Sequence, residues 1–306
     1  MVFLNSFRLL SSNFTKALKF LLYYIAVIAL CICAFLPAYF GLKGIISENA
    51  QDFNAGGVFS VFNGHLGDGI YAVLNVFFDS VVDSFSTNVA LAVYGLFVIF
   101  ILLPFLVNVG KYTLNVMFYA YMTSGRNVGF WSAYIKSLGK SVLFALTKTF
   151  YNLIFVAIVL FVCFGFAQIH NEYFVEHFLA LTTFVVLVLL YTLHQTTVLG
   201  WSSAIVVFDC SVFVGYRKGL KAVGRHFCKT FFTTGVFFAL FWAMIMVFGV
   251  YSAVVLVPIL TTILVVYDMV AFYTSQGMRF YISKNQIMTP KKLEEVDNIN
   301  KTAFIL

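Results

Sequence analysis

The sequence predicts an all-α, polytopic membrane helical bundle with six transmembrane helices, arranged as three repeats of an interfacial elbow helix followed by two spans. Three observations predict it: six long apolar stretches, basic residues at every second joint between them, and a recurring basic segment before each odd-numbered span. Hydrophobic residues make up 62% of the 306 residues and charged residues only 10%, whereas a soluble domain carries about 25% charge. A lipid bilayer is therefore the expected environment.

The first two spans flank a long outer segment. A span needs about 20 apolar residues to cross the hydrocarbon core, and the first covers residues 18–40. The outer segment, 41–86, has a glycine-rich middle that predicts a loop and a second half, 70–85, with the period of an amphipathic helix. The second span, 87–122, would be about 54 Å long as a helix. We therefore expect it to tilt, to kink at Pro104 or to project into the cytoplasm.

The remaining spans follow with shorter connections, and the membrane domain as a whole covers residues 1–282. The four further spans are predicted at residues 142–169, 178–208, 231–251 and 253–281. A short acidic outer loop, 170–177, joins the third span to the fourth. A polar cytoplasmic tail, 283–306, ends the chain.

The basic residues are divided unequally between the two sides of the membrane. All but one of the 19 Lys and Arg residues lie at the N-terminus, at every second joint, in the tail or, for Lys111, near that same side. Lys43 alone lies on the opposite side, among the acidic residues of the outer segment. Short basic loops stay in the cytoplasm, so both termini are predicted to be cytoplasmic. The excess of Lys over Arg, with 38 Phe and 17 Tyr, is typical of an AT-rich bacterial genome, so a bacterial plasma membrane is expected.

Each odd-numbered span follows a segment with one order of apolar, basic, small and polar residues. The three segments read FRLLSSNF at 7–14, IKSLGKSV at 135–142 and LKAVGRHF at 220–227. Pro104 and Pro258 also each precede a Phe-Tyr pair by 14 residues. Because any joint beside a membrane tends to be basic and amphipathic, part of this likeness follows from topology alone. The predicted repeats, related by an axis along the membrane normal, are residues 3–122, 128–208 and 212–282.

No catalytic motif is present, so neither an enzyme nor a cofactor is expected. HExxH, GxSxG and P-loop patterns are all missing. The five cysteines form no CxxC pair and are interpreted as small buried hydrophobes. The outer loop holds His170, Glu172, Glu176 and His177, which are donor types for a divalent metal. A solvated acidic loop needs no metal, however, and no metal site is predicted.

Polar residues inside the spans are the candidates for a functional site, because hydrocarbon makes them energetically costly. The ligand-binding candidates are Asn108, Lys111, Asn115, His194, Gln195 and Asp268. One polar cavity open to the cytoplasm would account for all of them, with Lys111 and Asp268 as a charge pair. The alternative is ordinary hydrogen bonding between helices, with Lys111 extending to the interface.

A second candidate surface precedes the fifth span. Five cations lie there close together: Arg217, Lys218, Lys221, Arg225 and Lys229. On the cytoplasmic surface they suit anionic lipid headgroups, at roughly 1 kcal/mol for each well-placed cation, or an acidic partner. The basic residues flank the membrane rather than forming one soluble face, so nucleic acid is not an expected partner.

On the three elbow segments and the topology of residues 1–282, the chain resembles a loose group of uncharacterised six-span membrane proteins of Gram-positive bacteria. It is also similar in style to the membrane domain fused to some bacterial glycerophosphodiester phosphodiesterases. The catalytic phosphodiesterase domain of those proteins is not part of this sequence. The resemblance therefore implies a fold and no hydrolase activity.

Two functional classes remain. A permease-like protein, or the membrane subunit of a transport system, would use a polar cavity among the even-numbered spans and an energy-coupling partner subunit elsewhere. A non-transporting scaffold or lipid-interacting accessory protein would form a closed apolar bundle whose polar groups are satisfied in pairs. An enzyme acting on lipids is a distant third, because no paired catalytic groups occur at one interface.

The topology can be tested with single cysteines introduced in place of Asp68 and Lys218, after the native cysteines are replaced. We expect a membrane-impermeant thiol reagent added to intact cells to modify position 68, because the outer segment faces outward, and to leave position 218 unmodified. Labelling at position 218 without labelling at position 68 would reverse the assignment.

Overall fold

The computed structural model describes residues 2–52, 80–168, 173–224, 227–248, 253–283 and 286–289. Its helices, one π-helical turn and two strands are, in order, α1 (Val2–Ser12), α2 (Phe14–Asp52), α5 (Val89–Phe97), η1 (Val98–Leu102), α6 (Leu103–Ser124), α7 (Phe130–Gln168), α8 (Tyr173–Val198), α9 (Trp201–Phe208), α10 (Val212–Gly224), α11 (Phe227–Phe248), α12 (Ala253–Gln276), β1 (Phe280–Ser283) and β2 (Gln286–Met288). Several predicted features lie outside the described residues: the glycine-rich middle of the outer segment, the start of the acidic loop, Arg225 and the end of the tail.

Five helical stretches of the described chain are long and apolar enough to cross a membrane, judged by length and composition. They are Phe14–Gly44, Val89–Ser124, Phe130–Val162, Val185–Phe208 and Val254–Gln276. The chain is thus helical as predicted, and these stretches fit a multi-pass membrane protein. Helix α11 contributes a shorter apolar stretch, Phe227–Leu240.

The chain divides into two compact units, and each unit contains parts of several helices. One unit comprises Met1–Ala26, Leu106–Lys148 and Thr192–Leu306, and the other comprises Val27–Phe105 and Thr149–Tyr191. The first unit therefore draws on all three of the predicted repeats, whereas the second draws on the first two only.

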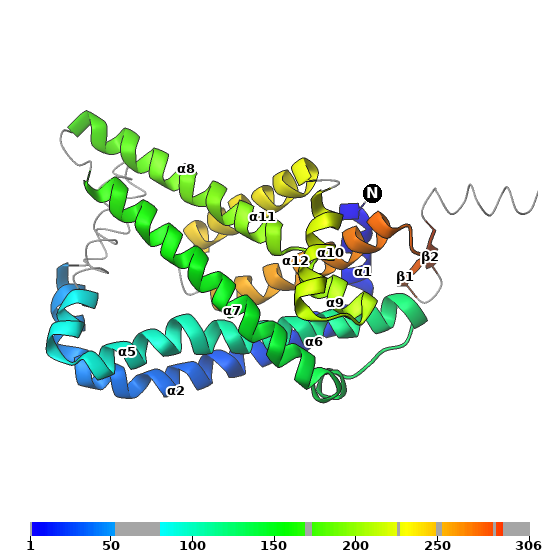
Figure 1. Cartoon of the computed structure of the whole chain (residues 1–306), viewed down its shortest axis with the longest axis horizontal. Coiled ribbons are helices and arrows are strands. Elements are labelled where there is room, and N and C mark those ends of the chain that lie inside the picture. The colour runs from blue at the N-terminus through cyan, green and yellow to red at the C-terminus, as the bar shows by residue number, and fades with distance from the viewer. Residues whose placement is uncertain are drawn as a thin grey trace, which may run out of the picture. The chain divides into compact units, whose positions relative to one another are not determined.

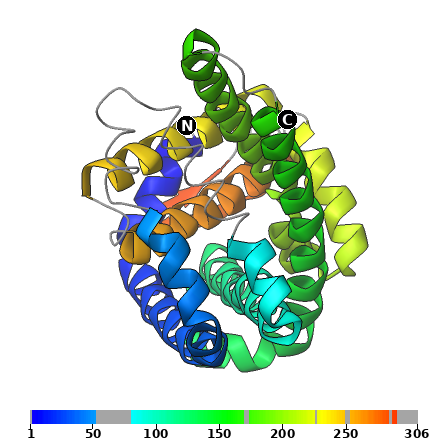
Figure 2. The same cartoon turned by 90° about the vertical axis from the view of Figure 1, so that its left-hand side faces the viewer.

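In the second unit, α5 packs along the second half of α2 (Figures 1 and 2). The Tyr94 hydroxyl donates a 2.8 Å hydrogen bond to the carbonyl of Ala34. At the next residue of each helix, a Cβ at Gly95 would lie only 3.2 Å from the ring of Phe35, so the small residue lets the two helices approach. The start of α5 is capped by Asn88, whose side chain accepts from the amide of Leu91.

The predicted kink in the second span takes the form of a π-helical turn. Helix α5 passes through η1 into α6 without a break, and the amide of Leu103 bonds to the carbonyl of Val98. Pro104 has no N–H, and its ring crowds the carbonyl four residues earlier. A wider turn directly before the proline accommodates this crowding, as π-helical turns inside α-helices do elsewhere.

In the first unit, Asn13 separates α1 from α2. Its side-chain amide donates to the carbonyl of Leu9 and its side-chain oxygen accepts from the Lys16 ammonium at 2.7 Å. Lys16 is only 3% exposed, and its ammonium lies 4.0 Å from the ring centroid of Tyr121 on α6. A cation over an aromatic face is attracted by the ring quadrupole, so this contact fastens the start of α2 to α6.

The last span was predicted to be longer than the helix that the structure contains. The sequence predicted a helix to residue 281, whereas α12 ends at Gln276 because Gly277 adopts a left-handed conformation with φ of 70°. The amide of Met278 then bonds to the carbonyl of Tyr273 at 3.0 Å, which is how a glycine commonly closes a helix. The chain folds back as the antiparallel hairpin β1–β2, and the Ser12 hydroxyl of α1 donates to the carbonyl of Ile282 in β1.

The predicted fourth span, 178–208, is interrupted near its end. Helix α8 stops at Val198, Gly200 has a φ of 81°, and α9 begins at the next residue. Helix α10 packs against α9 (Figure 1), and a Cβ at Gly219 of α10 would lie 2.6 Å from the carbonyl carbon of Gly200. The indole N–H of Trp201 donates to the carbonyl of Val212 at 2.8 Å and closes the other end of this α9–α10 pair.

The glycine contact between α9 and α10 leads to a prediction about stability. Gly219→Ala is expected to destabilise the protein by about 1–3 kcal/mol, the usual cost of overpacking, because the new methyl group meets main-chain atoms that cannot rotate away. Gly139→Ala is the matched control: it also lies in a helix, and nothing lies within 4 Å of its added Cβ. That substitution should stabilise by up to about 1 kcal/mol through helix propensity. Thermal unfolding in detergent measures both, and equal melting temperatures for the two variants would contradict the close contact.

Candidate functional site in the membrane-spanning helices

Four ionisable residues from four different helices interact electrostatically inside the stretches that are apolar enough to cross the membrane. Lys111 lies on α6, Lys148 on α7, His194 on α8 and Asp268 on α12. Lys148 acts on Lys111, His194 and Asp268, and Lys111 also acts on His194. We call these four residues the charged group. By formal charge, with His194 counted as neutral, its two lysines outnumber its one aspartate.

Asp268 is the most thoroughly bonded member of the charged group. It is 5% exposed, and its carboxylate accepts a 2.6 Å hydrogen bond from the Ser203 hydroxyl on α9. The backbone of Gly200, at the break before α9, also bonds to it. A carboxylate at the first turn of a helix satisfies amides that have no partner within the helix. Asp268 therefore caps the interrupted helix from a neighbouring one.

Two buried amide side chains lie on the same helix as Lys111, and each is incompletely bonded. Asn115 is fully buried, and its amide nitrogen donates to the Ser202 hydroxyl at 2.8 Å. Its side-chain oxygen has no hydrogen-bond partner within the described residues, and neither does the amide nitrogen of Asn108. A buried polar atom without a partner costs about 1–3 kcal/mol. Both atoms are thus available to bind water or a ligand.

A cavity of about 30 Å³ lies beside Asp268. Its lining comprises Leu199, Gly200, Ala222, Val223, Thr230, Asp268, Ala271, Phe272 and Ser275. One water molecule takes up roughly this volume in the liquid. The cavity can therefore hold one small species and no larger solute.

Some of the candidate residues chosen from the sequence interact with one another in the structure, and others do not. Lys111, His194 and Asp268 belong to the charged group, and Asn115 reaches α9 through Ser202. Asn108 is buried on α6. Gln195 is half-buried beside His194, and its side chain makes no hydrogen bond within the part of the chain that the structure describes. The charged side chain that acts on Asp268 is Lys148, whereas the partner expected from the sequence was Lys111.

Sequence reasoning missed Lys148, Ser202, Ser203 and the break at Gly200. Lys148 lies only a few residues beyond the elbow segment 135–142, so its position in the sequence is also typical of a basic joint at the edge of the membrane. The fourth span does contain a signal: Gly200 is followed, after Trp201, by Ser202 and Ser203. An apolar helix that is interrupted by glycine often marks a site in transport proteins.

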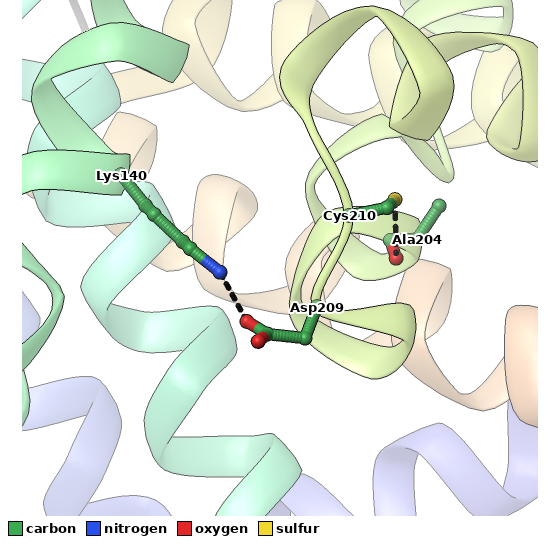
Figure 3. A network of polar contacts seen from close by, with 4 residues as sticks. All are labelled: Lys140, Ala204, Asp209 and Cys210. Carbon is green, nitrogen blue, oxygen red and sulfur yellow. Dashed lines mark hydrogen bonds and ion pairs between the residues drawn. The ribbon is translucent and has the colours of Figure 1, made fainter.

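An ion pair fixes the turn between α9 and α10 near this site. Figure 3 shows the Lys140 side chain of α7 pointing to the carboxylate of Asp209, with which it forms an ion pair. Asp209 has a φ of 48°, a left-handed conformation that aspartate tolerates better than most residues. The next residue, Cys210, directs its thiol to the carbonyl of Ala204 at 3.7 Å. The turn is therefore held by α7 on one side and by α9 on the other.

The basic surface predicted before the fifth span lies on α10 and at the start of α11. Arg217, Lys218, Lys221 and Lys229 are all exposed. Helix α10 also exposes large apolar side chains, with Phe213 at 73% and Val214 at 43%. Its opposite face is buried through Val212, Gly215, Gly219, Ala222 and Val223. A helix with one buried face and an exposed mixture of basic and apolar side chains is typical of a membrane interface.

Within the described residues, no group of three or more His, Cys, Asp and Glu side chains is arranged to hold a metal ion. The outer loop with His170 and Glu172 lies partly outside those residues. No protein-family model matches the chain, and no curated protein or solved structure matches it either. The residues themselves are therefore the basis for any functional proposal.

The electrostatic link between Lys148 and Asp268 predicts energetic coupling. Lys148→Met and Asp268→Leu should each lower the melting temperature in detergent, because each leaves the other charge in a poorly solvated place. The double variant should lose less than the sum of the single losses, by about 0.5–3 kcal/mol. Lys218→Met combined with Asp268→Leu is the control, because Lys218 is exposed and lies over the ring of Phe208. Additive losses in the Lys148 cycle would show that the two charges are independent.

Proposed function

We propose that the chain is a permease-like integral membrane protein, or the membrane subunit of a transport system, with an anion-accepting polar site formed by α6, α7, α8 and α12. The observation that carries the proposal is the charged group itself. A charged residue at the centre of a membrane helix costs roughly 3 kcal/mol. Four ionisable residues that interact across four helices suit one shared, hydrated site.

The sign of the charge supports an anionic or amphipathic solute. Lys111 and Lys148 give the charged group an excess of one positive charge over the carboxylate of Asp268, with His194 neutral. That excess is uncompensated within the group. A carboxylate or phosphate group of a solute entering from the cytoplasm would neutralise it.

The incomplete bonding of Asn108 and Asn115 supports the same proposal. A closed bundle is expected to satisfy its buried amides in pairs, because hydrocarbon supplies no alternative partner. Each of these side chains instead keeps one polar atom without a protein partner in the described chain. A site that admits water or solute gives both atoms a partner.

The proposed topology completes the five apolar stretches with α11 as a sixth span. Each of the three repeats then consists of an elbow and two spans, with both termini in the cytoplasm of a bacterial cell. The exposed cations of α10 would lie at anionic headgroups of the plasma membrane. Energy coupling would come from a partner subunit, because the sequence has no P-loop motif.

A non-transporting scaffold or lipid-interacting accessory protein is the second candidate, and one observation favours it. Asp268 is bonded by Ser203, and the cavity beside it measures only about 30 Å³. A closed bundle with internally paired polar groups would have both properties. The two candidates differ in whether a water-soluble solute reaches the charged group.

Thiol labelling separates the two candidates. Asn115→Cys, in a variant without the native cysteines, is exposed to water-soluble thiol reagents in inside-out vesicles. We expect modification by an anionic reagent, and slower modification by a cationic reagent of similar size, because the local excess charge is positive. Leu146→Cys is the control: Leu146 is 42% exposed on α7, close in sequence to Lys148, and we expect it to face lipid and to exclude both reagents.

The scaffold would be favoured if position 115 proved as unreactive as position 146. Faster modification by the cationic reagent would contradict the proposed anion preference while leaving an accessible cavity.

A further inference from the structure

We infer that an apolar groove between α2 and η1, which extends along α2 from Ile28 to Tyr39, binds one phospholipid molecule. One acyl chain lies in the groove, and the headgroup phosphate lies at Lys43. This lipid site is separate from the solute site of the proposed function. All residues that form the groove belong to the second unit, whereas the four residues of the charged group belong to the first.

The groove has the size and the lining of a site for a hydrocarbon ligand. It is a cavity of about 410 Å³ lined by residues of α2, of η1 and by Leu103, the first residue of α6. Sites for small molecules usually measure about 300–1,000 Å³. Within the described residues the surface of the groove is entirely apolar. A polar solute would lose its hydrogen bonds to water there, so the groove suits a hydrocarbon chain.

The groove has a buried floor and an open side. Cys31 of α2 and Val98 of η1 are buried and form the floor, whereas Leu36 of α2 and Ile99 of η1 are exposed and border the opening. Both helical stretches are apolar enough to cross a membrane, so the opening faces the hydrocarbon of a bilayer. An acyl chain is the apolar molecule that a bilayer supplies at that place.

The length of the groove matches one leaflet of a bilayer. The distance from Ile28 to Tyr39 corresponds to about 16 Å along a helix, and half of the hydrocarbon core is about 15 Å thick. Tyrosine side chains are enriched where hydrocarbon meets the headgroups, and Tyr39 is exposed. The Tyr39 end of the groove therefore lies at headgroup depth, and the Ile28 end lies near the middle of the membrane.

The π-helical turn η1 forms one wall of the groove. Just before this turn, α5 approaches α2 closely at Gly95, where an added Cβ would lie 3.2 Å from the ring of Phe35. The wider π-helical turn then changes the direction of the following side chains, and Val98 and Ile99 of this turn line the groove. Such turns inside α-helices occur frequently at functional sites. The groove thus opens directly beside a close helix contact.

Lys43 supplies a charge that is complementary to a phosphate. It follows Tyr39 by four residues in α2, so the two side chains lie on one face of the helix, one turn apart. Lys43 is exposed, and it is the only charged residue of α2 between Lys19 and Glu48. Lysine side chains near the ends of membrane helices attract anionic headgroups. A lipid whose acyl chain fills the groove therefore brings its phosphate to Lys43.

The test uses a phosphatidylglycerol with a photoreactive group in its acyl chain, added as a small fraction to phosphatidylcholine nanodiscs that contain the full chain. After irradiation, proteolysis and mass spectrometry locate the adducts. We expect adducts at Cys31 and Leu36 to exceed those at Leu30 several-fold, because Leu30 is exposed on the same helix but does not line the groove. Lipid that only surrounds the protein would label Leu30 at least as strongly.

Two pairs of variants test the two parts of the site. Leu36→Trp should reduce the adducts at Cys31 several-fold, because the larger side chain fills the groove, and Leu30→Trp is the matched control that should leave them unchanged. Lys43→Gln should reduce the adducts of phosphatidylglycerol several-fold. It should not reduce those of a diacylglycerol with the same photoreactive chain, which has no phosphate. Lys19→Gln removes an exposed cation from the other end of α2 and should change neither.

Equal labelling of Leu30 and Cys31 would overturn the inference and leave only lipid that surrounds the protein. Absence of adducts in the groove would also overturn it and would indicate another occupant, such as a segment of this chain. Unchanged adducts in Lys43→Gln would overturn the contact with the phosphate. If Leu36→Trp does not fold, Ile99→Trp tests the opposite side of the opening in the same way. Thiol labelling at position 115 concerns the charged group alone, so the lipid site and the proposed function can fail separately.

Discussion

Gly200 and Gly219 bring the main chains of α9 and α10 so close that neither position has room for a side chain. Gly200 also ends α8 with a left-handed turn, which leaves the first amides of α9 without partners inside the helix. Asp268 of α12 accepts a hydrogen bond from the backbone of Gly200, and the Ser203 hydroxyl donates to its carboxylate. The interruption of one apolar helix therefore determines where a buried carboxylate can be stable, and the other residues of the candidate site surround that carboxylate.

The charges near this carboxylate are stabilised by several weak contacts rather than by one buried ion pair. Lys148 acts on Asp268 and also lies 5.5 Å from the ring centroid of Phe144. Phe144 in turn packs against Trp201, whose indole holds the start of α10. The aromatic side chains of α7 and α9 thus position a lysine that hydrocarbon alone would repel.

Much of the fold followed from composition and periodicity. The helical, multi-pass character was predictable because apolar runs of about 20 residues have no other stable form in a bilayer. Helix ends were less predictable. Gly277 ended α12 five residues before the predicted limit of the last span, and Pro104 produced a π-helical turn rather than a sharp kink. In each case a single backbone conformation decided the outcome, and hydropathy carries no information about it.

The sequence by itself determined that polar side chains lie within apolar helices, since burial cost makes Lys111, His194 and Asp268 exceptional wherever they lie along a span. Only the tertiary structure decided which of them meet, because helix rotation and packing follow from close contacts such as Gly200 with Gly219. It brought Asp268 close to Lys148 and to the hydroxyl of Ser203. Hydropathy sets the depth of a residue in the membrane, whereas its neighbours are set by the packing of side chains far apart in the chain.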